Sequence, residues 1–504
     1  MKALPWICLI GLFCFLSVYM WLNGDRLTDS DISSEMILAR LLNEEHALIS
    51  KNWFYSTELR VLNIQILYSF FFHFFHDWTM VRAATCIASY LLMLVSYYYM
   101  IHQMDCDRIY AVSAIFLFLP VSDGYFEYVL LALLYASFIS IYFFAVGMTF
   151  HYAHASGRMK KLLLVITVCL AFMSGLGGAR HVVVLYLPLF AVAVLLALMQ
   201  RRPSGYLVCS AAGFAASAIG YLVNSKALAG RYHFETWVGG MKFRVSLQGI
   251  SDLFFGTLRA FGYSYGDNEP TPAASAFSCV LVLVMAVCVL RTILKKWKEP
   301  DQTWLLAMYF VCVYGIFFCM YTFTDMLYSD RYNMAAIVFA IPIMVLNLTE
   351  ISWRRCWKAG LLIFLGGGVL LSSVSRYARY GSLDKTAEFR SIVAYLTEEE
   401  VLAGYTAFWN GNVLTELSDG EIDVWVWEDD LSDQYDVDGV VPWLQAVKHQ
   451  TTTPEGRVFL LFTDEEYAVC PFKAALDQEE IDYQSENYRM YVFDSHEELV
   501  ETVQ

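Results

Sequence analysis

Long apolar runs separated by short polar stretches fill the first three quarters of the chain. A helix needs about 20 apolar residues to cross the hydrocarbon core of a bilayer. The runs predict eleven membrane-spanning helices, at residues 4–22, 82–101, 108–120, 129–150, 162–178, 182–200, 206–223, 274–294, 303–323, 333–349 and 359–375. We therefore expect an all-helical, polytopic membrane bundle.

The last part of the chain follows a different pattern. Short β-rich runs such as IDVWVW and RVFLLF alternate there with polar, helix-like stretches. Alternation on this scale is typical of a small mixed domain with a sheet. The pattern divides the chain into a membrane domain at 1–375 and a soluble α/β domain at 376–504.

One apolar segment, at 61–78, complicates the count of spans. It contains two amides and two histidines, and a crossing at this point would invert the side of every later loop. We interpret it as a helix that lies on the outer membrane surface. The first long outer segment then covers 23–81. A second outer segment covers 224–272, and its amphipathic stretch 245–262 predicts another interfacial helix.

Lysine and arginine are concentrated in alternate loops. They occur around residues 108, 158–161, 201–202, 291–298 and 354–358, whereas the loops between these hold few. Loops rich in Lys and Arg face the cytoplasm in most membrane proteins. The asymmetry predicts a multi-pass protein of the cell membrane with a cytoplasmic N-terminus and an extracytoplasmic C-terminal domain.

Composition agrees with a membrane protein. The chain is 58% hydrophobic and 16% charged, whereas soluble domains carry about a quarter charged residues. The net charge of −15 arises mostly from acidic residues that follow residue 383. Since the sequence has no basic stripe and no known nucleic-acid-binding motif, nothing indicates a nucleic-acid partner. The bilayer is the partner that composition implies.

Charged side chains also gather near the predicted outer ends of spans. The stretch DRLTDSDISSE at 25–35 is acidic, although its Ser and Asp are also good N-caps for a following helix, so a purely structural role is one interpretation. A second outer loop carries Asp123 and Glu127, and isolated outer arginines are found at Arg60, Arg82, Arg180 and Arg331. Carboxylates and cations at one membrane face suit a phosphate-linked substrate.

The layout resembles the GT-C superfamily of membrane glycosyltransferases. It is similar to lipid-linked aminoarabinose transferases and protein O-mannosyltransferases, the family 39-like enzymes, which carry Asp-Glu and then Tyr-Ala-Glu-Ile after their first span. This chain has Asp29 and then SEMI at 34–37. The resemblance implies that Asp29 is catalytic. Asp31 is the alternative, because Ser30 stands where the family has Glu.

The resemblance also implies a reaction. It is the transfer of a sugar from a polyprenyl-phosphate donor to an extracytoplasmic glycan, lipid or protein, with inversion at the anomeric carbon. A carboxylate would act as the base. Substrate-binding residues would be Glu35, Arg60, Arg82, Asp123, Glu127, Arg180 and Arg331, and a Mg²⁺ or Mn²⁺ ion, if one is used, would bind at Asp29, Asp31 and Asp123.

Two other functions fit the same sequence. A transporter or a flippase for lipid-linked glycans would also be polytopic, but such proteins place ionisable groups near the middle of the membrane, whereas most of the spans predicted here lack central charges. A non-enzymatic membrane scaffold is the third alternative. An enzyme requires that Asp29 and Asp123 share one outward cavity with an arginine.

Overall fold

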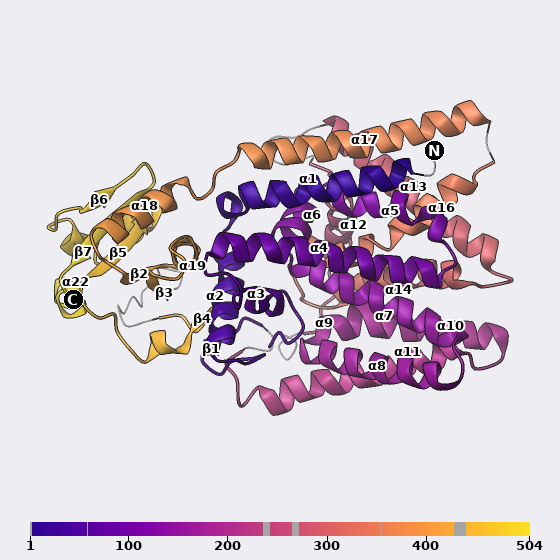
Figure 1. Cartoon of the computed structure of the whole chain (residues 1–504), viewed down its shortest axis with the longest axis horizontal. Helices are drawn as coiled ribbons and strands as arrows, with labels where there is room; N and C mark the ends of the chain where they lie inside the picture. The colour runs from indigo at the N-terminus through magenta and orange to yellow at the C-terminus, as the bar shows by residue number, and fades with distance from the viewer. Residues whose placement is uncertain are drawn as a thin grey trace.

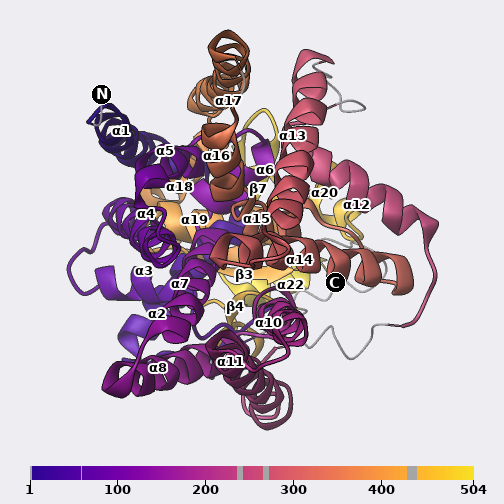
Figure 2. The ribbon, with the colours of Figure 1, turned by 90° about the vertical axis from the view of Figure 1, so that its right-hand side faces the viewer.

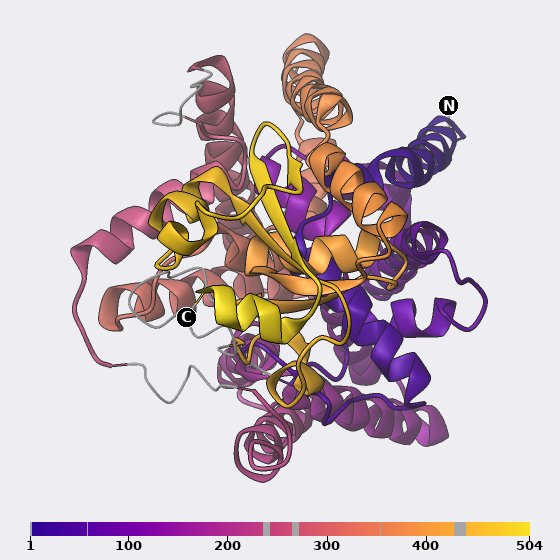
Figure 3. The same ribbon diagram turned by 90° about the vertical axis from the view of Figure 1, so that its left-hand side faces the viewer.

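The computed structural model describes residues 3–57, 59–234, 242–264, 272–352, 354–427 and 440–503. Its helices form an elongated bundle, and a mixed sheet domain covers one end of that bundle (Figure 1). The N-terminus lies at the opposite end. Figure 2 views the bundle from this N-terminal end, and Figure 3 views it from the other end, with the sheet domain in front of the helices.

In the described part of the chain, nine helices are long and apolar enough to cross a bilayer. They are Leu4–Leu27 (α1), Trp78–Gln103 (α4), Leu134–His154 (α7), Gly157–Leu176 (α8), Ala179–Gln200 (α9, η4 and α10), Gly205–Leu228 (α11 and η5), Pro272–Lys296 (α13), Gln302–Phe323 (α14) and Arg355–Glu398 (α17 and α18).

Two further spans are bent. One pairs Asp107–Phe118 with Asp123–Leu131 at 102°, and the other pairs Asp330–Ile337 with Ala340–Glu350 at 48°. Counting each bent pair as one span gives up to eleven, which agrees with the eleven apolar runs. The fold class predicted from hydropathy, a polytopic helical bundle with a C-terminal α/β domain, is therefore confirmed.

The basic loops gather at the end of the bundle that is far from the sheet domain. Arg108 lies 3.4 Å and Lys295 lies 2.8 Å from the carboxylate of Glu350, so three loops that are distant in sequence meet there. The alternation between loops rich and loops poor in Lys and Arg thus corresponds to the two ends of one bundle. Which end faces the cytoplasm stays a prediction.

Short elements fill the space between the bundle and the sheet domain. They are Ser30–Glu44 (α2), Trp53–Phe54 (β1) and Gln65–Phe71 (α3). At 1.5 Å per residue α3 is only about 10 Å long, too short to cross a bilayer. In the second predicted outer segment, Leu247–Arg259 forms α12, which lies within the predicted interfacial stretch 245–262.

The C-terminal sheet has five strands in the order β3-β2-β5-β7-β6. They are Ala403–Ala407 (β2), Asp423–Trp427 (β3), Val458–Thr463 (β5), Tyr483–Gln484 (β6) and Tyr488–Phe493 (β7). The pairs β2–β3 and β2–β5 are parallel, whereas β7 is antiparallel to both neighbours. The helix Phe408–Leu417 (α19) provides the crossover from β2 to β3 that a parallel pair requires.

The sheet domain is joined to the membrane domain by more than one chain segment. The strand β1 pairs antiparallel with Gln445–Ala446 (β4), so the first outer segment and the tail share a small second sheet. The helix α17, Arg355–Ser382, runs past the predicted domain boundary at residue 376 toward α18, Ala387–Glu398. The predicted boundary itself stays a prediction.

Candidate active site

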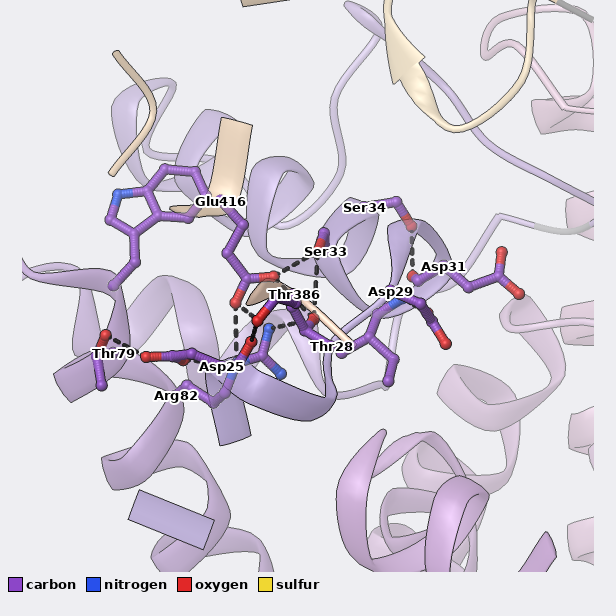
Figure 4. Close-up of polar contacts among 12 residues, drawn as sticks. Asp25, Thr28, Asp29, Asp31, Ser33, Ser34, Thr79, Arg82, Thr386 and Glu416 are labelled. Carbon is purple, nitrogen blue, oxygen red and sulfur yellow. Dashed lines mark hydrogen bonds and ion pairs between the residues drawn. The ribbon is translucent and has the colours of Figure 1, made fainter. Parts of the chain in front are cut away.

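The turn between α1 and α2 carries the first group of acidic residues. The helix α1 ends at Leu27, the backbone is extended at Asp29 (φ −142°, ψ 175°), and the Asp29 carboxylate accepts a hydrogen bond of 3.0 Å from the backbone N–H of Ile32. This is the geometry of an N-cap. Asp29 and Asp31 point to the same side of the turn, away from Arg82 and Glu416 (Figure 4).

Asp31 lies in an unusual electrostatic environment. Its side chain is exposed, yet burial within the surrounding protein raises its pKa, and the neighbouring Asp29 raises it further. Arg60 and Arg331 act in the opposite direction and lower this pKa. Asp31 therefore lies within electrostatic range of one other carboxylate and of two arginines.

Two arginines from distant segments, Arg60 and Arg331, lie within electrostatic range of this carboxylate, and a third, Arg180, lies within range of Arg60. Arg60 follows β1, Arg180 lies in the short helix Ala179–His181 (α9), and Arg331 lies in the turn Asp330–Asn333 (η7). Burial lowers the pKa of Arg60 to about 10, and repulsion from Arg180 and Arg331 contributes to this shift. We refer to Asp29, Asp31, Arg60, Arg180 and Arg331 as the acid–arginine cluster.

Acidic and aromatic neighbours hold these arginines in place. Arg60 forms an ion pair with the buried Glu35 of α2. The Arg180 guanidinium lies 5.0–5.4 Å from the ring centroids of Tyr135, Phe138 and Tyr332 and donates a hydrogen bond of 3.1 Å to the Tyr135 hydroxyl. The aromatic rings and the hydroxyl orient the guanidinium of Arg180, and Glu35 orients that of Arg60.

Arg331 extends this positive surface. Its guanidinium lies 5.7 Å from the centroid of the Tyr332 ring. Its Nε is buried, and among the described residues this Nε has no hydrogen-bond partner. A buried donor without an acceptor is unfavourable by about 1–3 kcal/mol. An anion bound at this position would supply the missing acceptor.

The second group of acidic residues is held by α17. The carboxylate of Asp123 lies 3.5 Å from Arg376 and 3.3 Å from Arg379, and Glu127 accepts a hydrogen bond of 2.8 Å from the Tyr380 hydroxyl. These pairs occupy the two acids with partners of their own. Neither acid therefore faces the acid–arginine cluster as a free carboxylate.

The two acidic loops are nevertheless neighbours. Tyr128, the residue after Glu127, lies within electrostatic range of Arg331, Asp31 and Asp29. The short helix Asp123–Tyr125 (α6) also packs against η7, the turn that carries Arg331. The loop around Asp123 is therefore a wall of the same region. The shared cavity that an enzyme would need there stays a prediction.

Arg82 has a different environment from the other predicted phosphate ligands. It lies in α4 with a side chain only 2% exposed, and its Nε donates a hydrogen bond of 2.9 Å to Glu416 of α19, while Asp25 lies 3.7 Å away. We call Asp25, Arg82 and Glu416 the buried ion-pair cluster. These acids already pair with Arg82, and its binding of a lipid phosphate stays a prediction.

Residues that the sequence did not single out complete the region. Glu416 gives no signal in the sequence, because its partner Arg82 is 334 positions away. The rings of Tyr135 and Tyr332 that hold Arg180 are inconspicuous in a chain with 16% aromatic residues. Arg376 and Arg379 could have been noticed in the sequence, because both are cations close to the end of an apolar run.

The donor set does not complete a metal site. Within the ranges that the structure describes, no group of three or more His, Cys, Asp or Glu side chains is arranged to hold an ion. Asp29 and Asp31 offer two carboxylates with the hard oxygens that Mg²⁺ or Mn²⁺ prefers, but Asp123 is paired with arginines of α17. The metal site at Asp29, Asp31 and Asp123 stays a prediction.

Comparison with known proteins finds a similar fold but no similar sequence. No family model matches this chain, and no curated protein matches it. Its structure is similar to the crystal structure of the oligosaccharyltransferase of Archaeoglobus fulgidus, solved with a tethered acceptor peptide containing the NVT sequon. The TM-score is 0.54 at 11% sequence identity, over 94% of this chain and 71% of that one.

At this identity the likeness establishes the fold. The chain is a multi-span membrane protein whose bundle and C-terminal α/β domain together resemble those of this oligosaccharyltransferase. Membership of the GT-C superfamily stays a prediction. The chemistry of this chain rests on its own residues.

Proposed function

We propose that this protein transfers a sugar from a polyprenyl-phosphate donor to an acceptor, at the end of the bundle that carries the sheet domain. The observation that supports this most strongly is the acid–arginine cluster. Residues from four separate segments converge there, so that two carboxylates lie near cations that could hold a lipid phosphate. The fold of a membrane oligosaccharyltransferase provides independent support.

The mechanism requires two kinds of charge. The acceptor hydroxyl attacks the anomeric carbon as the bond to the lipid phosphate breaks, and the carboxylate takes the hydroxyl proton. The phosphate leaves with the bonding electron pair, and Arg180 and Arg331 stabilise the negative charge that develops on it. One direct displacement of this kind inverts the anomeric centre.

Asp29 and Asp31 are not equally suited to act as the base. One oxygen of Asp29 already accepts a hydrogen bond from the N–H of Ile32, as the cap of α2. Asp31 is exposed at the surface, and its pKa is raised by burial and by Asp29. A base with a higher pKa accepts a proton more readily in the transition state. We therefore assign the base to Asp31 and a helix-capping and tuning role to Asp29.

The test uses the variants Asp29→Asn and Asp31→Asn, singly and together, in proteoliposomes with the full-length protein. A panel of polyprenyl-phosphate hexoses and pentoses, radiolabelled in the sugar, is offered with glycan, lipid and peptide acceptors. We expect the double variant to lose transfer. The matched control is Glu44→Gln, which removes an exposed charge at the other end of α2 that is paired with Arg40. Full activity of the double variant would refute the proposal.

A flippase for lipid-linked sugars is the alternative that a structural feature favours. Two of the spans are bent, by 102° and 48°, and broken spans are common in transporters. The same proteoliposomes separate the two functions. Movement of the intact lipid-linked sugar across the bilayer, unaffected by the double Asp variant, would support the flippase and not the transferase.

A further inference from the structure

Glu416 connects the sheet domain to the turn that carries the two proposed catalytic acids. It lies on α19, 334 positions from Arg82, and is 4% exposed. Its Oε1 accepts the hydrogen bond from Arg82, whereas its Oε2 accepts hydrogen bonds from the Thr28 hydroxyl at 3.1 Å and the Ser33 hydroxyl at 2.5 Å (Figure 4). Both carboxylate oxygens are therefore fully occupied.

The two hydroxyl donors lie on either side of the acids. Thr28 is the residue before Asp29, and Ser33 is two residues after Asp31. A second side chain of α19, Asn412, donates to the backbone carbonyl of Ser30 at 3.4 Å. The short turn that contains both acids is thus fixed at three points by a helix of the sheet domain.

A carboxylate suits this set of partners best, because Arg82 can only donate and an ionised carboxylate accepts at both oxygens. Glutamine has the same shape and could donate its NH₂ to the two hydroxyls, but it carries no charge and would leave Arg82 with Asp25 alone. Arg82 also supplies the positive charge that a buried carboxylate needs.

We propose that Glu416 is a positioning residue, which fixes the turn at 28–33 so that Asp31 faces Arg60 and Arg331. The inference rests on the proposed transferase function. It gives the C-terminal domain a specific role as a structural part of the active site, because the acids take their working geometry only when α19 is docked.

The test compares three full-length variants in detergent and in proteoliposomes. Glu416→Gln removes one acceptor. The double variant Thr28→Val and Ser33→Ala removes the donors and leaves the Arg82–Glu416 pair intact, so it stays informative if Glu416→Gln fails to fold. Glu421→Gln is the matched control, an exposed acid five positions after Glu416. The readouts are hydrogen exchange at 30–34 and the kinetics of sugar transfer.

We expect amide exchange at 30–34 to accelerate at least tenfold in the first two variants, since the N–H groups of Ile32 and Ser33 bond to Asp29. The kcat should fall by roughly 10²-fold, because small displacements of reacting groups are costly, with KM for the donor unchanged and the acid limb of the pH profile displaced. Glu421→Gln should match the wild type in every readout.

The outcomes separate the two claims. Wild-type exchange and wild-type kcat in the Thr28→Val, Ser33→Ala variant would overturn the positioning role and leave the transferase function intact. Absence of sugar transfer by the wild-type protein would refute the transferase function. Exchange at 30–34 that does not respond to Glu416→Gln or to the double variant would refute the anchoring contact whatever the activity.

Discussion

The two acids of the acid–arginine cluster and the buried ion-pair cluster lie on opposite sides of one turn (Figure 4). The charges of the two clusters are balanced in different ways. In the buried cluster, Arg82 and Glu416 are each less than 5% exposed and form a direct ion pair. In the other cluster, Asp31 is exposed, and three arginines lie close enough to repel each other.

The difference shows which charges are available for chemistry. A buried pair in direct contact has little left to offer a substrate, and removing one partner leaves an uncompensated charge. In the acid–arginine cluster, Asp31 is exposed, and the buried Nε of Arg331 has no hydrogen-bond partner among the described residues. Residues with the same charges, a few positions apart in sequence, therefore have structural roles in one cluster and proposed catalytic roles in the other.

The largest expected effect is on catalysis. Replacing Asp29 and Asp31 together with Asn should lower kcat by about 10²–10⁴-fold, the usual contribution of a general base. The melting temperature should change little, because neither side chain is in a buried ion pair. Measurement of sugar transfer alongside thermal unfolding checks both statements. A large loss of stability would place these acids among the structural residues.

The second effect is on stability. Arg82→Leu leaves Glu416 buried without its cation and should destabilise the protein by about 3–5 kcal/mol. The double variant Arg82→Leu, Glu416→Leu should recover most of that loss, because an apolar pair of similar volume avoids the unpaired charge. Unfolding in graded denaturant gives both values. If the double variant is as unstable as the single one, the pair is not a simple ionic contact.

The third effect is on substrate affinity. Arg331→Gln removes a cation whose Nε is buried without a partner in the described part of the chain. We expect KM for the lipid-phosphate donor to rise about tenfold, the low end of the contribution of hydrogen bonds to charged groups, with stability unchanged. Steady-state kinetics at varied donor concentration provides the measurement. An unchanged KM would exclude Arg331 from the phosphate site.

The smallest effect is on the pH profile. A carboxylate base acts in its ionised form, so kcat/KM should fall as the pH drops through the pKa of Asp31. Asp29 raises that pKa and Arg331 lowers it. In Asp29→Asn the acid limb should therefore move to lower pH, and in Arg331→Gln to higher pH, each by a fraction of a unit. Shifts in the same direction would show that Asp31 is not the base.

The fold followed from local patterns over most of the chain. Hydropathy predicted the spans because each transmembrane helix must form its own backbone hydrogen bonds and be apolar along its length. Both requirements concern consecutive residues. The bends of the pairs at Asp107–Leu131 and Asp330–Glu350 were not predicted. Strand runs in the tail were predicted, but the order β3-β2-β5-β7-β6 arises from pairing between distant segments.

Only part of the candidate site could be predicted from the sequence. The acids at 29 and 31 could be proposed from their position after the first span, and Arg60, Arg180 and Arg331 from isolated charges near aromatic residues. The interpretation of Arg82 did not distinguish a phosphate ligand from a structural cation, because nothing in the sequence connects it with Glu416. Likewise, nothing in it links Asp123 with Arg376 and Arg379.

By itself, the sequence determined that this is a multi-span membrane protein with a mixed C-terminal domain, because those features depend on apolar runs and alternation between neighbouring residues. Tertiary structure alone decided which charges neutralise each other and which are left facing an open surface. The physical reason is that the state of a charge depends on the groups within a few ångströms of it, and in this protein those groups come from segments hundreds of residues apart.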